Sequence, residues 1–166
     1  MERRGARRLR AGGAALAACA LFTGCGGSPP ARVSPAHEFA ANAADLISQL
    51  HDDVTVSGAT AVSLTSAQRA LDDSSDLYVM LVAYNDFGSC SAMVRNAGTA
   101  DARFGRVEAS LGSACGFLER AARLFADAAT RSDARALVRA ARTTLQASPL
   151  LYRAQVELDA VRGSHP

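Results

Sequence analysis

The most regular pattern of apolar residues lies between residues 104 and 128, where they recur at alternating steps of three and four. This spacing puts them on one face of an α-helix, because a helix completes a turn every ~3.6 residues. The segment therefore predicts one long helix, whose buried face is formed by Phe104, Val107, Leu111, Ala114, Leu118, Ala121, Phe125 and Ala128.

The preceding segment carries the same spacing from Met80 to Ala97. Residues 96–99 (NAGT) separate the two patterns and combine a helix stop with a residue type that caps helix N-termini. The two segments together predict a pair of antiparallel helices joined by a short connection.

A first helix is predicted upstream of this pair. Ser34 followed by Pro35 is typical of a helix start, and an apolar face from Phe39 to Leu50 predicts a helix running to about His51. Residues 52–64 (DDVTVSGATAVSL) lack helical spacing, and we expect a loop there, although Val-Thr-Val alternation would also suit a short strand.

The second predicted helix opens at Thr65, which forms a capping-box pattern with Gln68. Its middle, residues 77–84 (LYVMLVAY), is apolar on every side and taken alone would suit a buried strand. The flanking sequences favour a buried, central helix that continues to Ala97, with the hydroxyls of Tyr78 and Tyr84 at its edges.

Two more apolar-faced segments follow Arg131. Asp133 and the preceding serine cap the first, and Ser148-Pro149 starts the second, which Gly163 ends. Because proline breaks or bends helices, these segments are either two short helices or one kinked helix.

Counting the last two segments as one helix gives four helices. Alanine supplies 36 of the 166 residues and aromatics only 5%, so strong helix formers dominate the chain. The predicted fold is therefore all-α: an antiparallel, up-down four-helix bundle over residues 35–163, with the last helix kinked or split at Pro149.

Residues 1–24 have the layout of a secretory signal. Five of the first ten residues are arginine, and residues 11–22 are an apolar run. A helix of twelve residues rises ~18 Å, less than the ~30 Å hydrocarbon core of a membrane, so a permanent transmembrane helix is disfavoured.

The apolar run ends in Leu21-Phe22-Thr23-Gly24-Cys25, which resembles the lipobox of bacterial lipoproteins, with Phe22 where that family usually has leucine. The resemblance covers residues 1–25 only. It implies that the Cys25 thiol carries a diacylglyceryl group and becomes the first residue after cleavage, which would hold the protein on the extracytoplasmic face of the cell membrane.

The alternative is ordinary signal cleavage after the A-x-A-like Ala18-Cys19-Ala20, which would leave Cys25 unpaired in a secreted protein. Under the lipid-anchor prediction, residues 25–34 comprise the lipidated cysteine and a Gly/Ser/Pro tether that spans ~15–18 Å.

Charge argues against a nucleic-acid partner. From Cys25 onward the chain has 13 arginines and 15 acidic residues, so the basic balance of the whole chain comes from the leader.

Cys90 and Cys115 are the two thiols left once Cys19 is removed and Cys25 is lipidated. Exported proteins usually pair such thiols, and the predicted antiparallel helices bring the two residues to about the same level. Glycines near both cysteines (Gly88, Gly112 and Gly116) predict that the two backbones approach closely there. A redox-active pair is the less favoured alternative, since no C-x-x-C occurs.

A ligand pocket is predicted at Tyr84, Asn85 and Asp86, because polar groups there follow directly on the apolar run. The alternative is a structural role, hydrogen bonding between helices, which is more frequent for such residues.

Other charged groups give weaker signals. Asp72, Asp73 and Asp76 lie close together but lack the pattern of a calcium loop, and the three histidines are too far apart in sequence to predict a zinc site. No metal or cofactor is expected.

Arginines 135, 139 and 142 share one helix face and would suit anionic headgroups, but an exposed face neutralised by Asp127, Asp133 and Glu157 is the simpler expectation.

No sequence pattern typical of a catalytic site occurs. We therefore expect a non-enzymatic, lipid-anchored envelope protein that binds a partner protein or a small ligand. The alternatives are an accessory subunit of a membrane complex and an envelope enzyme whose site is not visible in the sequence.

Overall fold

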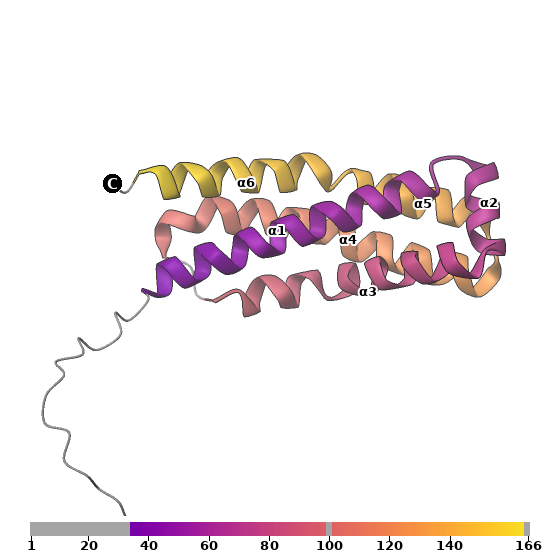
Figure 1. Ribbon diagram of the computed structural model, residues 1–166, viewed down its shortest axis with the longest axis horizontal. Helices are drawn as coiled ribbons and strands as arrows, with labels where there is room; N and C mark the ends of the chain where they lie inside the picture. Colours follow the sequence, from indigo (N-terminus) through magenta and orange to yellow (C-terminus); the bar gives the residue numbers. More distant parts are fainter. Residues whose placement is uncertain (1–33, 99–100, 165–166) are drawn as a thin grey trace, which may run out of the picture. The chain divides into compact units, whose positions relative to one another are not determined.

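The computed structural model describes residues 34–98 and 101–164. These residues contain no β-strand, and they form a helical bundle (Figure 1), which confirms the all-α class. Its elements are α1 (Pro35–Thr60), α2 (Leu64–Asp72), α3 (Ser74–Asn96), the 3-10 turn η1 (Ala102–Phe104), α4 (Gly105–Arg131), α5 (Ala134–Leu145) and α6 (Ser148–Gly163).

Helix α4 provides the centre of the core. It packs against α3, α5 and α6, and every residue of the predicted apolar face from Phe104 to Ala128 is buried, with at most 3% of its surface exposed. Figure 1 shows α5 and α6 in succession along the bundle and α2 across one end, and α3 packs against both α1 and α4. The sequence pattern therefore identified the main packing helix correctly.

Helix α1 is longer than predicted and runs to Thr60, so the loop expected at residues 52–64 is confined to residues 61–63. Its second half buries Val54, Ser57 and Gly58, and Ala61 at its end is also buried. These buried residues recur at helical spacing, but most of them are small. The buried face of this segment therefore differs little in hydrophobicity from its polar face. Gly58 lets Leu145 of α5 approach, since an added Cβ would lie 2.6 Å from Leu145 Cδ2.

The second predicted helix is divided into α2 and α3. Its capping box lies two residues earlier than expected, between Ser63 and Ser66. The break is at Asp73, whose Oδ1 accepts hydrogen bonds from the backbone N–H groups of Ser75 and Asp76. The same hydrogen bonds lower the pKa of the Asp73 carboxyl. The acidic cluster at 72–76 thus contains a helix cap.

The outer face of α3 differs from the buried, central helix that was predicted. Met80, Ala83 and Tyr84 point into the core. The opposite face is exposed, and its apolar residues are Tyr78 (66% exposed), Val79, Leu81 and Val82. An all-apolar segment lacks the polar residues that would show which face meets water.

The predicted Cys90–Cys115 disulfide is confirmed. The bridge joins α3 to α4 with an S–S distance of 1.99 Å and a Cα–Cα distance of 5.3 Å, and both cysteines are fully buried. Next to it, the carboxylate of Glu119 accepts a hydrogen bond from the backbone N–H of Ser91 at 3.1 Å.

The proposed reason for the neighbouring glycines is wrong. Gly112 and Gly116 are exposed, and a Cβ added at either would meet no atom within 4 Å. At Gly88 an added Cβ would lie at an ordinary 3.8 Å from Ala122. The close approach of the two helices therefore does not require these glycines.

Two other predicted caps are present, at α1 and α5, whereas α4 and α6 begin without a side-chain cap. Ser34 Oγ accepts a hydrogen bond from the backbone N–H of His37 at 3.3 Å, and Asp133 caps α5 in the same way. The last part of the chain forms two helices, since α5 ends at Leu145 and α6 begins at Ser148. Pro149 is the second residue of α6. The signal sequence, Cys25 and the tether up to Val33 lie outside the described residues.

Candidate functional site

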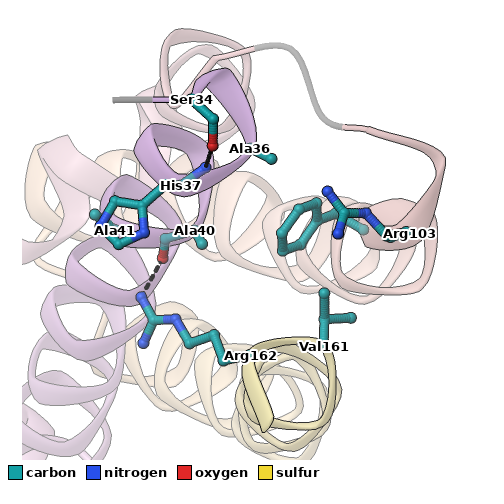
Figure 2. A pocket seen from close by; sticks show the side chains of 9 residues that line it. Ser34, Ala36, His37, Ala40, Ala41, Arg103, Val161 and Arg162 are labelled. Atoms are coloured by element: carbon teal, nitrogen blue, oxygen red, sulfur yellow. Dashed lines mark hydrogen bonds between the residues drawn. The ribbon is translucent and has the colours of Figure 1, made fainter. Parts of the chain in front are cut away.

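A groove of about 510 Å³ lies where the first described residue, Ser34, meets the end of α6. Its walls come from the start of α1, from η1 and from the last turn of α6 (Figure 2). The volume is within the range of small-molecule sites, ~300–1,000 Å³. Nine residues line it: Ser34, Ala36, His37, Ala40, Ala41, Arg103, Phe104, Val161 and Arg162.

Aromatic packing fixes the apolar part of this groove. The ring of Phe104 lies 5.0 Å from the ring of Phe39, centroid to centroid and tilted, and both side chains are buried. This contact attaches η1 to α1. Since Phe104 also lines the groove, the site has an apolar surface that does not depend on exposed, flexible side chains.

Two arginines and one histidine supply the polar part. Arg162 Nη2 donates a hydrogen bond to the backbone carbonyl of Ala40, which directs the guanidinium of α6 toward α1. Arg103 Nη2 lies 3.0 Å from Asp101 Oδ2. Figure 2 shows His37 and Arg162 together near α1, with Arg103 on the other side of the opening.

The charge of the lining is one-sided. None of the nine described residues around the groove is acidic, whereas two are permanently cationic. A smaller groove of about 270 Å³ adjoins it, shares Arg103 and Val161, and adds Arg106 and Glu157. Glu157 accepts a hydrogen bond from Ser110 Oγ at 2.8 Å, so this carboxylate already has a partner in the bundle.

The three residues predicted to form a pocket, Tyr84, Asn85 and Asp86, have different surroundings in the bundle. Tyr84 points inward, where its ring stacks on Phe125 at 4.3 Å and its hydroxyl accepts a hydrogen bond from Thr144 at 3.3 Å. Burial raises the pKa of this phenol to about 12. Asn85 is exposed, and Asp86 accepts a hydrogen bond from Gln49 of α1 at 2.9 Å.

One carboxylate near Asp86 has an unusual environment. Asp53 of α1 has a buried oxygen, Oδ2, without a hydrogen-bond partner. Burial, and then the charges of Asp86 and Asp52, raise the pKa of this carboxyl. Across the described ranges, no three histidine, cysteine or acidic side chains are grouped so that they would hold a metal ion.

A second basic groove, of about 250 Å³, lies between α2 and α5. It is lined by Leu64, Arg135, Val138, Arg139 and Arg142. It contains all three arginines of the predicted stripe, together with two apolar residues.

Sequence spacing identified the arginine stripe of the second groove, but not the remaining residues of either groove. His37, Arg103 and Arg162 come from three elements that only the folded bundle brings together, and Leu64 comes from a segment that was predicted as part of a loop.

The described helices include none that is both long enough and apolar enough to span a membrane. Comparison of the chain with protein-family profiles, with curated proteins and with solved structures finds no match.

Proposed function

We propose that this chain is an exported, lipid-anchored protein of a bacterial envelope, and that its helical domain binds other molecules without catalysing a reaction. The leader supports export and anchoring, because a basic segment, an apolar run and a lipobox-like LFTGC follow one another in residues 1–25. Two acyl chains on Cys25 would give stable membrane attachment, which a single chain does not.

For the architecture we propose an antiparallel, up-down four-helix bundle. In this assignment α1, α3 and α4 are three of the helices, and α5 with α6 forms the fourth, split at Pro149. Helix α2 is then an insertion that covers one end. The packing of α4 against α3, α5 and α6 and of α1 against α3, α5 and α6 supports this assignment.

The observation that carries the binding role is the groove at the start of α1. Two guanidinium groups and an imidazole share it with the buried ring of Phe104, and no acidic residue lines it. Of the two guanidinium groups, that of Arg103 also pairs with Asp101, just outside the lining. Guanidinium groups pair well with carboxylates and phosphates, and an apolar surface favours a hydrocarbon or ring. The ligand we propose is therefore a small anion with an apolar portion.

The positions of Tyr84, Asp86 and His51 support a role without catalysis. Tyr84 is held in the core by Phe125 and Thr144, and burial raises its pKa to about 12, further from neutral pH than the pKa of an exposed tyrosine. Asp86 is paired with Gln49 on the surface, and His51 is exposed on α1. A general acid and base have to converge on one substrate position, which these three side chains do not.

Phenyl phosphate is a suitable probe, because it joins an anionic group to an aromatic ring. We expect the lipidated protein, extracted in a nonionic detergent, to bind phenyl phosphate more tightly than inorganic phosphate or phenol. Substitution of both groove arginines (Arg103→Gln and Arg162→Gln) should weaken binding by about a hundredfold or more, since charge-assisted hydrogen bonds contribute ~1.5–3 kcal/mol each.

The matched control removes two exposed arginines on other faces, Arg120→Gln and Arg153→Gln. Calorimetry or a shift of the His37 ring resonances measures the affinity. Equal weakening in both double variants, or equal affinity for phenol and phenyl phosphate, would contradict an anion site in this groove.

A second candidate function is that of an accessory subunit in a membrane complex. It is favoured by the exposed apolar face of α3, formed by Tyr78, Val79, Leu81 and Val82. Co-purification from membranes tests it: a partner that is retained by the native protein and lost with Leu81→Gln supports it, and a protein that elutes alone argues against it.

A further inference from the structure

The groove between α2 and α5 has a composition that differs from the rest of the surface. Three arginines on α5, at positions 135, 139 and 142, form one wall with Val138. Leu64 forms the other wall from α2, and 53% of its surface is exposed. We call these five residues the α2–α5 basic surface.

The positive charge of this surface is largely uncompensated. Of the three acids expected to neutralise the stripe, Asp127 forms no ion pair within the described residues. Asp133 has Oδ2 at 3.9 Å from Arg139 Nη2, while its Oδ1 is occupied in capping α5. Glu157 accepts its hydrogen bond from Ser110 on α4. No described residue that lines the groove is acidic, so an anionic occupant would meet three guanidinium groups.

The spacing of the arginines favours a helical occupant. Positions i, i+4 and i+7 of α5 lie on one face and span about 10 Å along the helix. A partner helix with carboxylates at the same spacing can pair with each arginine in turn. The exposed side chain of Leu64 beside the stripe would accept an apolar residue of that partner, as in other helix-in-groove contacts.

We infer that the α2–α5 basic surface docks an acidic, amphipathic helical segment of a partner protein. The carboxylates of that segment pair with the three arginines of α5, and an apolar side chain packs on Leu64. This site is separate from the groove at the start of α1, so either site can fail its test without the other.

The test uses the full lipidated protein and a synthetic helical peptide of about twenty residues, long enough to form a helix. The peptide carries glutamates at i, i+4 and i+7 with neighbouring leucines, and a second peptide has glutamine in place of glutamate. We expect fluorescence anisotropy to show binding of the glutamate peptide only, with an affinity that falls as salt rises.

Two variants locate the binding. Replacing the three arginines of α5 with glutamine should lower the affinity for the glutamate peptide by at least tenfold, and Leu64→Gln should lower it severalfold. The matched control replaces three exposed arginines on α3, α4 and α6, namely Arg95, Arg120 and Arg153, and should change the affinity by less than twofold. Melting curves confirm that all variants are folded.

Several results would overturn the proposal. They are no binding of the glutamate peptide, equal binding of both peptides, or equal weakening in the control variant. Displacement of the peptide by soluble dihexanoyl phosphatidylglycerol, but not by the phosphatidylcholine analogue, would assign the surface to lipid headgroups. Self-association in light scattering that the triple variant abolishes would assign it to a second copy of the chain.

Discussion

Reduction of the Cys90–Cys115 bridge should lower the stability of the bundle by an amount that follows from the chain it closes. The two cysteines are 25 residues apart in sequence. Loop-closure entropy for a loop of this size is about 12 cal/mol/K, which corresponds to about 3.5 kcal/mol at 25 °C. The helices cover about 130 residues from Pro35 to Gly163, whose unfolding entropy is about 270 cal/mol/K. The expected decrease in Tm is therefore about 13 °C.

Thermal unfolding followed by far-UV circular dichroism, with and without reductant, measures this decrease. Reduced wild-type protein isolates the effect of the cross-link. The variant Cys90→Ala/Cys115→Ala should melt lower still, because both cysteines are fully buried and their removal also costs packing.

Alkylation of the unfolded protein and mass spectrometry verify that the bridge is open. If both thiols are free and Tm falls by less than about 3 °C, the loop-closure reasoning is refuted. That result would mean that the α3–α4 pair stays close together in the unfolded chain, so that the bridge restricts little.

Three further predictions concern α4 and α1. Gly112→Ala and Gly116→Ala should each stabilise the protein by up to about 1 kcal/mol, since an added Cβ meets no atom within 4 Å and alanine favours helix; a loss of stability in denaturant titrations would contradict this. Gly58→Leu should destabilise by about 1–3 kcal/mol, because even a Cβ there comes within 2.6 Å of Leu145 Cδ2, and unchanged stability would show that Leu145 moves freely. Asp53→Asn should stabilise the protein at neutral pH more than the exposed Asp52→Asn does.

The sign of the Asp53 effect follows from its raised pKa. Folding favours the protonated form of Asp53, so its stabilising contribution is complete below the unfolded pKa of about 3.8. The contribution is lost as the pH rises through the higher folded pKa. Unfolding measured from acidic to neutral pH should show this loss in wild type and not in Asp53→Asn. The same slope in both proteins would contradict the assignment.

The sequence predicts those parts of the fold in which large apolar residues alternate with polar ones. The apolar stripe from Phe104 to Ala128 predicted α4. Pairing that helix with the preceding one, which contains Cys90, predicted the disulfide. The second half of α1 was missed because Ser57 and Gly58 take core positions where apolar side chains are expected.

The groove at the start of α1 was harder to predict, because its residues are adjacent only in the folded bundle. The polar run Tyr84–Asp86 was predicted to form a pocket because it follows the apolar segment. In the structure Tyr84 lies in the core, Asn85 is exposed and Asp86 accepts a hydrogen bond at the surface. Arg103 and Arg162 stand in ordinary amphipathic segments, and nothing in their spacing distinguishes them from other exposed arginines.

Mass spectrometry of the mature protein's N-terminus, purified from membranes, tests the central claim most directly. The account predicts an N-terminal peptide that begins at Cys25 and carries a diacylglyceryl group on its sulfur. An N-terminus at any other residue, or an unmodified Cys25, would contradict the lipid anchor and with it the proposed place of this protein in the envelope.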